Sequence, residues 1–90
     1  MDFEWNPQKA TLNLAKHNVS FDEASTVFND PLSRTFDDPD HSLDERRFII
    51  VGYSDKNRLL FVCHTDSDKI VRLISAREVT SNERKQHEKK

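Results

Sequence analysis

The stretch from Glu45 to Arg77, ERRFIIVGYSDKNRLLFVCHTDSDKIVRLISAR, decides the fold. It contains three apolar runs rich in Ile, Val, Leu and Phe, and each run has the length of a single strand. The links between the runs are short and polar, as hairpin connections are. The stretch therefore predicts a three-stranded antiparallel meander. The runs are Glu45–Tyr53, Arg58–Thr65 and Lys69–Arg77, and the links are Ser54–Asn57 and Asp66–Asp68.

The register of this meander decides which side chains share a face, because side chains alternate along a strand. The expected partners are Tyr53 with Arg58, Arg47 with His64, Thr65 with Lys69 and Val62 with Arg72. One face is then an uncharged core face with Phe48, Ile50, Leu59, Phe61, Cys63, Val71 and Leu73. The other carries Glu45, Arg47, Ile49, Val51, Leu60, Val62, His64, Ile70, Arg72 and Ile74. A simple core contains no such charges, so the second face is the candidate for chemistry. A slip of one residue in either hairpin separates this group.

Length and composition limit the class of protein. Ninety residues predict one small domain spanning residues 1–90. The formal net charge of −2 gives no global basic signature of a nucleic-acid binder, so an anionic partner has to be held by local clusters. The single cysteine, Cys63, excludes an internal disulfide and is expected to be a buried, inert thiol. No run approaches the ~18 apolar residues of a membrane span, and no signal peptide opens the chain. We therefore expect a cytoplasmic protein with no membrane partner.

The N-terminal part predicts an edge strand and two helices. Asp2–Trp5 is short and extended, and Asn6-Pro7 is a good helix start. The first helix runs to His17, places Ala10, Leu14 and Ala15 on one side with Lys9 and Lys16 flanking them, and ends at Asn18. Ser20 to Glu23 forms a capping box that opens the second helix. That helix buries Phe21, Ala24, Val27 and Phe28 and stops at Asp30-Pro31.

The remaining segments are polar. Ser33–Phe36 predicts a brief strand. The acidic run Asp37–His41 is either a metal site or, more commonly for such loops, a solvated one, and we assign no metal and no cofactor. Thr80 to Glu83 is a second capping box, which opens a short polar C-terminal helix. The predicted fold is α+β: a small antiparallel sheet with two N-terminal helices and a C-terminal helix.

Several motifs of the chain resemble one known family. They are FEWNPQKATLNLAKHNVSFDEASTVFNDP (Phe3–Pro31), ERRFIIVGY (Glu45–Tyr53) and KIVRLISAREVT (Lys69–Thr80), followed by a Glu-rich tail. In this order they resemble BrnT, the ribonuclease toxin of BrnT–BrnA type II toxin–antitoxin systems, whose fold is similar to RelE. The sequence departs from the family where Asn6 replaces Asp, Asn18 replaces Gly and His87 replaces a common Tyr.

The resemblance implies an mRNA-cleaving toxin that a BrnA antitoxin holds inactive. Such an antitoxin carries a ribbon-helix-helix part, and the toxin–antitoxin complex represses its own operon. Operator DNA is then contacted only through the complex, while RNA is the substrate of the toxin.

Metal-independent RNA cleavage uses the 2′-hydroxyl as nucleophile and needs a base, an acid and cations that stabilise the phosphorane. Arg47 and Arg72 are candidates to bind the phosphate, and Arg77 a neighbouring one. His64 is the candidate acid or base, because histidine titrates near neutrality, and Glu45 is its candidate partner. The residues assigned to RNA binding are Lys9, Lys16, His17, Arg46 and His87.

Each assignment has a structural alternative. His64 is also compatible with a hydrogen-bonded strand histidine, and Glu45 with a surface ion pair to a neighbouring arginine. Lys16 and His17 also complement the negative end of their helix. A second hypothesis for the whole chain is a catalytically weak or inactive binding module that acts with the antitoxin as a transcriptional co-repressor.

Overall fold

The three apolar runs form neighbouring antiparallel strands, as predicted. In this computed structural model they are β3 (Arg47–Tyr53), β4 (Leu59–Ser67) and β5 (Ile70–Glu78). The structure describes residues 1–38 and 46–89, and within these ranges the sheet has five strands in the order β1-β5-β4-β3-β2. Glu45 and most of the acidic run up to His41 lie outside the described residues.

The two outer strands come from the N-terminal half of the chain. The predicted strand at Ser33–Phe36 is present as β2 (Arg34–Asp37), antiparallel to β3. The predicted edge strand is β1 (Asp2–Glu4), which pairs with β5 in parallel. The sheet is therefore mixed, and the prediction of an antiparallel sheet was wrong at this edge. A three-residue strand has the same apolar pattern in either direction, so its sequence does not specify its orientation.

The first helix has the predicted ends but a different buried side. In α1 (Pro7–His17), the Asn6 side chain accepts hydrogen bonds from the N–H groups of Gln8 and Lys9, and Asn18 ends the helix at φ 58°. The apolar side expected from the sequence is not buried as a whole: Leu14 is 48% exposed and Ala15 is exposed, whereas Ala10 is half-buried. The buried residue is Asn13. Its amide bonds both backbone groups of Ala76, beyond the point where β1 stops covering that edge of β5.

The second helix, α2 (Phe21–Thr26), continues into the 3₁₀ turn η1 (Val27–Asn29). The Ser20 hydroxyl accepts from the Glu23 N–H, which is half of the predicted capping box. The other half is absent, because the buried Glu23 carboxylate accepts hydrogen bonds from the Arg58 guanidinium and the Ser54 hydroxyl. Arg58 holds the pKa of Glu23 below its ordinary value. This contact ties α2 to the β3–β4 turn.

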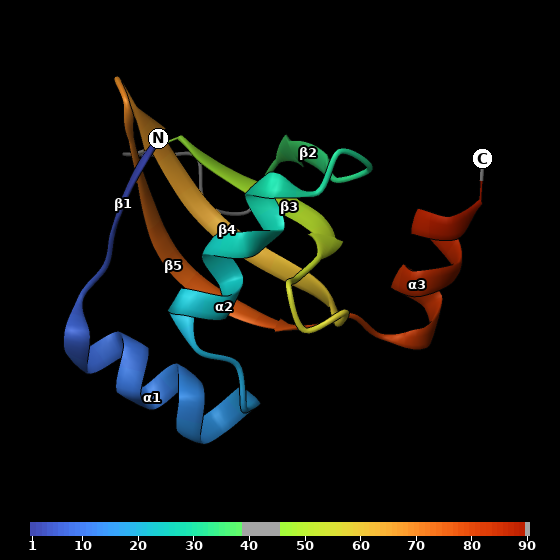
Figure 1. Cartoon of the computed structure of the whole chain (residues 1–90), viewed down its shortest axis with the longest axis horizontal. Coiled ribbons are helices and arrows are strands. Elements are labelled where there is room, and N and C mark those ends of the chain that lie inside the picture. Colours follow the sequence, from blue (N-terminus) through green and yellow to red (C-terminus); the bar gives the residue numbers. More distant parts are fainter. Residues whose placement is uncertain (39–45, 90) are drawn as a thin grey trace.

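The C-terminal helix α3 (Ser81–Glu88) begins with the complete capping box that the sequence predicts, formed by Thr80 and Glu83. None of its eight described residues is buried. In Figure 1, α2 lies in front of the sheet and α1 below it, whereas α3 stands apart beside the turn between β3 and β4. Among the described residues, no helix has the length and apolar character of a membrane span.

The register of the meander differs from the predicted one in both hairpins. Ser54 and Arg58 pair through a backbone hydrogen bond of 2.9 Å, which leaves a three-residue loop with Asn57 in the left-handed region. Arg47 therefore lies opposite Thr65, and Phe48 opposite His64. This slip of one residue reverses the faces of β4 relative to β3.

The second hairpin is tighter than predicted. β4 extends to Ser67, which pairs with Ile70, and Asp68 in the left-handed region helps to close the turn. Thr65 therefore lies opposite Arg72, and Val62 opposite Ala76, with a bulge between Cys63 and His64. The predicted two faces are thus wrong for β4, but Arg47 and Arg72 remain on one side.

Two apolar clusters lie on the two faces of the sheet. The larger one packs the sheet against α1, α2 and η1, and its buried members are Val19, Phe21, Ala24, Val27, Ile50, Leu60, Val62, Val71, Leu73 and Ala76. The smaller one lies on the opposite face and contains Ile49, Val51 and Leu59, with Tyr53, Phe61, Cys63 and Val79 partly buried against it. The prediction that Cys63 lies on the core face was wrong. Its side chain is half-buried on the face opposite the helices.

Candidate nucleic-acid interface

The face of the sheet turned away from α1 and α2, which we call the distal face, carries four arginines among the described residues. Alternation and register place Arg34, Arg47, Arg72 and Arg77 there, together with Phe61 and Tyr53. Arginine binds phosphate oxygens bidentately, and aromatic rings stack on unpaired bases. The distal face thus combines the side chains that a single-stranded nucleic acid requires.

Two of the predicted phosphate ligands lie in one row across the sheet. Arg47 on β3 faces Thr65 on β4, and Thr65 faces Arg72 on β5. Because neighbouring strands are about 4.8 Å apart, the Cα atoms of the two arginines are separated by about 10 Å. Arg72 also lies 3.7 Å from the Glu4 carboxylate on β1, and its side chain is 43% exposed. We call Arg47, Thr65 and Arg72 the arginine row.

Arg77 lies further along the same face. Its guanidinium is 4.1 Å from the centre of the Phe61 ring and donates hydrogen bonds of 2.8 and 2.9 Å to the Glu83 carboxylate on α3. This contact lowers the pKa of Glu83 to about 2. Phe61, which pairs with Arg77, is four residues from Thr65, so Arg77 is about 13 Å from the arginine row.

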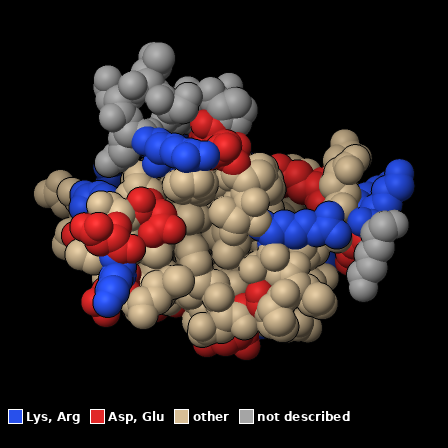
Figure 2. Space-filling model, turned by 90° about the horizontal axis from the view of Figure 1, so that it is seen from above, with Lys and Arg blue, Asp and Glu red and all other residues tan. Residues whose placement is uncertain are grey.

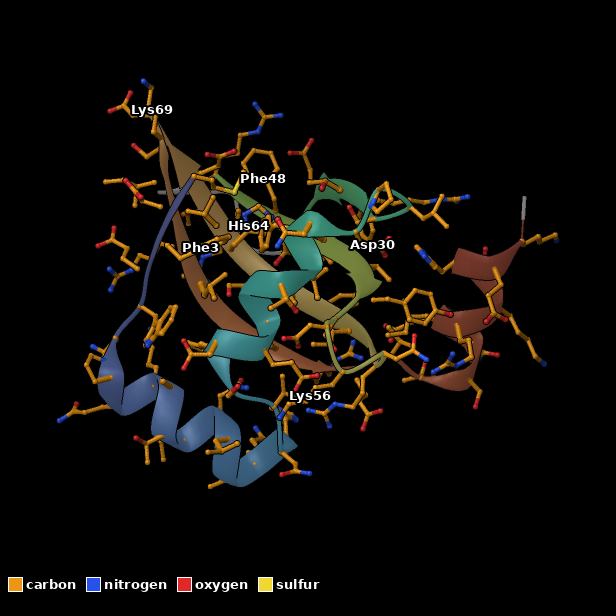
Figure 3. All side chains as sticks on the ribbon, in the orientation of Figure 1. Phe3, Asp30, Phe48, Lys56, His64 and Lys69 are labelled. Carbon is orange, nitrogen blue, oxygen red and sulfur yellow. The ribbon has the colours of Figure 1, made fainter. Side chains whose placement is uncertain are left out.

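His64 does not lie with the arginines. The register slip places it on the helix-covered face, where it is 3% exposed. Its ring lies 4.9 Å from that of Phe28 and 5.7 Å from that of Phe48, and Figure 3 shows it between the sheet and the α2–η1 segment. Burial lowers its pKa. Neither ring nitrogen has a hydrogen-bond partner among the described residues. The prediction that His64 shares a face with Arg47 and Arg72 was wrong.

The residues assigned to RNA binding are not brought together. Lys9, Lys16 and His17 belong to α1, which packs on the other side of the sheet. Arg46 is 71% exposed, pairs with Asp37 and lies over the ring of Phe48, also on the helix-covered side. His87 alone approaches the distal face, with its ring centre 6.2 Å from that of Tyr53.

Four distal-face residues are not among the predicted site residues: Arg34, Tyr53, Phe61 and Thr65. Arg34 belongs to a predicted strand whose partner the sequence does not specify. Phe61 is expected on the core face, and Tyr53 and Thr65 are expected on neither face. The loop residue Asn57, which tolerates a left-handed conformation, was the one available signal for the correct register.

The charge on the surface is local rather than continuous. In the view of Figure 2, lysine and arginine atoms lie beside aspartate and glutamate atoms, and uncharged surface separates these groups. Among the described residues no group of His, Cys, Asp and Glu is arranged to hold a metal ion.

The sequence matches a protein family over residues 5–83, and the family is described as the ribonuclease toxin BrnT of type II toxin–antitoxin systems. The chain belongs to the BrnT family. Family membership implies a ribonuclease toxin whose partner is a protein antitoxin.

The fold is similar to the crystal structure of the Brucella abortus ribonuclease toxin BrnT, with a TM-score of 0.68. The two sequences are 18% identical, and the match covers 90% of this chain and 99% of the Brucella chain. At this identity the likeness supports the BrnT fold and carries no residue roles. A search of curated proteins finds no match.

Proposed function

We propose that this BrnT-family toxin is an endoribonuclease that cleaves mRNA without a metal ion, and that the arginine row holds the scissile phosphate. The observation that carries the proposal is the placement of Arg47 and Arg72 on one face, on either side of the Thr65 hydroxyl. Guanidinium groups supply the positive charge that a metal ion supplies in other nucleases.

The reaction is an internal transfer. The 2′-oxygen attacks phosphorus, the bond from phosphorus to the 5′-oxygen breaks, and the products are a 2′,3′-cyclic phosphate and a free 5′-hydroxyl. A base removes the 2′-proton and an acid protonates the leaving oxygen. The two arginines stabilise the additional negative charge of the phosphorane. Glu45, two residues before Arg47 in the sequence, is our candidate base.

The test is cleavage of end-labelled RNA by the purified toxin, freed of antitoxin, in buffer with EDTA. We expect cyclic phosphate ends, and a loss of about 10²-fold or more in kcat/KM for Arg47→Ala and for Arg72→Ala. Lys56→Ala is the matched control, because it removes a cation from the exposed β3–β4 turn and leaves the distal face intact. Cleavage that survives both arginine substitutions overturns the role of the row. Absence of cleavage in the wild type favours a binding module.

We further propose that the antitoxin is a BrnA-type protein with a ribbon-helix-helix part, and that toxin and antitoxin meet in the cytoplasm. Expression of the toxin alone is expected to arrest bacterial growth. Co-expression of the antitoxin, a small protein expected to be encoded by a neighbouring gene, should restore growth. The toxin should bind operator DNA only in complex with that protein. Operator binding by the isolated toxin contradicts this arrangement.

A further inference from the structure

A groove of about 460 Å³ lies between the C-terminal end of α3 and the segment that leads into β2. Its lining includes Leu32, Arg34, Tyr53, His87 and Glu88. Sites for small organic ligands have volumes of roughly 300–1,000 Å³ and combine apolar walls with a few converging polar groups. The groove has both features, and the cleavage reaction proposed above does not use it.

The groups that converge on the groove fit a nucleotide. Tyr53 and His87 meet edge to face, at an interplanar angle of 67°, and provide aromatic surface for a base. Arg34 is exposed at one side of the groove and forms no ion pair or hydrogen bond with a described residue. The buried Nδ1 of His87 also has no hydrogen-bond partner among the described residues.

The one carboxylate among the described lining residues of the groove is already engaged. Glu88 accepts a hydrogen bond of 3.5 Å from the Tyr53 hydroxyl and lies 3.7 Å from Arg84 one turn earlier in α3. The charge of Glu88 is therefore shared with Arg84, and Arg34 supplies the remaining charge of the lining.

A second hollow that Tyr53 also lines provides a contrast. It has a similar volume, about 420 Å³, but its described lining includes the carboxylates of Asp30 and Asp55 and no cation. The Asp30 carboxylate accepts from the backbone N–H groups of Leu32 and Tyr53. An anionic group is repelled there, so charge distinguishes the two hollows.

Tyr53 and Arg34 also connect the groove to the distal face. Tyr53 is six residues from Arg47 on the same strand, and Arg34 pairs with Val51, four residues from Arg47, so the groove lies about 13 to 20 Å from the arginine row. An RNA strand that lies along the distal face reaches both places with different nucleotides. A nucleotide in the groove is therefore remote from the bond that is cleaved.

We propose that this groove is a nucleotide-binding subsite for single-stranded RNA, with the base against Tyr53 and His87 and a phosphate on Arg34. The proposal rests on the proposed function, because it takes RNA as the substrate. The subsite contributes affinity and sequence preference, and the chemical step occurs elsewhere. Stacking on aromatic side chains is the usual way in which proteins hold unpaired bases.

The first test does not need cleavage. The ¹⁵N-labelled toxin is titrated with each of the four nucleoside 5′-monophosphates, and amide shifts are followed by NMR. We expect saturable shifts at residues 34, 53 and 87, and affinity about tenfold weaker in Arg34→Ala and His87→Ala. Lys85→Ala, on α3 but away from the groove, is the matched control and should bind as the wild type does.

The second test uses RNA. Arg34→Ala and His87→Ala should raise KM and broaden the distribution of cut sites, with kcat nearly unchanged. Binding of nucleotides without RNA cleavage would defeat the proposed function and leave the subsite standing. If both variants cleave RNA with the KM of the wild type, and no nucleotide shifts the amide signals of the wild type, the subsite is wrong and the proposed function still stands. Amide shifts at residues 34, 53 and 87 that the antitoxin causes and no nucleotide causes would also overturn the subsite. They would assign the groove to the protein partner.

Discussion

Arg77 on β5 and Glu83 on α3 are joined by two parallel hydrogen bonds, of 2.8 and 2.9 Å, which fasten a helix without buried residues to the sheet. Glu83 also accepts a hydrogen bond from the Thr80 N–H, so a single carboxylate both caps α3 and anchors it. Short polar helices are marginal in water on their own. The Arg77–Glu83 pair is therefore expected to be the main contact that holds α3 beside the distal face, in addition to the contacts of Tyr53 with His87 and Glu88.

Substitution Glu83→Gln should release α3 without unfolding the sheet. A charge-assisted pair is replaced by weaker neutral bonds, so amide exchange in residues 81–88 should accelerate about tenfold while β4 stays protected. Hydrogen-exchange mass spectrometry measures both regions in one experiment. Asn82→Ala, which leaves the pair intact, is the control. Unchanged exchange in α3 would show that other contacts hold the helix.

Protonation of the Glu83 carboxylate should weaken the attachment of α3 at acid pH. The pKa of Glu83 is about 2 in the folded chain and about 4.5 when unfolded, so the folded state gains stability from its charge above pH 4.5. That contribution is lost as the pH falls from 4.5 towards 2. The protection factors of the α3 amides, calculated against the intrinsic exchange rate at each pH, should therefore fall over this range in the wild type. In Glu83→Gln the fall over this range should be smaller.

His64 predicts a second, separate pH dependence. Burial lowers the pKa of His64 below its ordinary value, so the unfolded chain takes up a proton at a higher pH than the folded chain does. The free energy of unfolding should therefore fall as the pH drops below about 6.5. Urea denaturation at a series of pH values measures it. His64→Phe should remove the slope just below pH 6.5, whereas His17→Gln should keep it.

The activity of the same variant tests the role of His64. Because the ring is 3% exposed under the helical layer, folded His64→Phe should cleave RNA within a few-fold of the wild-type rate. A loss of two orders of magnitude in a variant with a normal circular dichroism spectrum would restore His64 as a catalytic residue.

Part of the fold and of the candidate site can be predicted from the sequence. The meander, the helix caps at Asn6, Asn18 and Thr80, and the short strand at residues 34–37 follow from local patterns that neighbouring residues impose. The face of each strand depends instead on the turns. Asn57 and Asp68 adopt left-handed conformations that shift both registers by an odd number of residues. The two shifts cancel for Arg47 and Arg72, and they separate His64 from both.

The burial of α1 could not be read from apolar spacing either. The Asn13 amide pairs with the backbone N–H and C=O of Ala76 on β5, where a neighbouring strand would otherwise pair. It does so because β1 pairs with β5 only at residues 70–72. The spacing of apolar residues along α1 gives no information on such a contact.

Asn13→Ala should therefore destabilise the fold strongly. The buried amide donates to the carbonyl oxygens of Val19 and Ala76, at 3.0 and 2.8 Å, and accepts from the Ala76 N–H. Removing it leaves buried backbone groups unpaired, at a cost of about 2–4 kcal/mol in the free energy of unfolding. Leu12→Ala on the exposed side of α1 should cost less than about 0.5 kcal/mol. Equal effects of the two substitutions in urea denaturation would contradict the edge-completing role.

Gly52 on β3 lies in close contact with η1 and with the turn that follows it. A Cβ atom at this position would stand 2.8 Å from Cβ of Ser33 and 3.0 Å from Cγ1 of Val27. Gly52→Ala should therefore lower the free energy of unfolding by about 1–3 kcal/mol. If the clash is with Ser33, the double variant Gly52→Ala with Ser33→Gly should recover part of that loss. A double-mutant cycle in urea measures the coupling between the two positions. Strictly additive effects would place the cause elsewhere, in the Asp30 carboxylate, in Val27 or in the strand backbone.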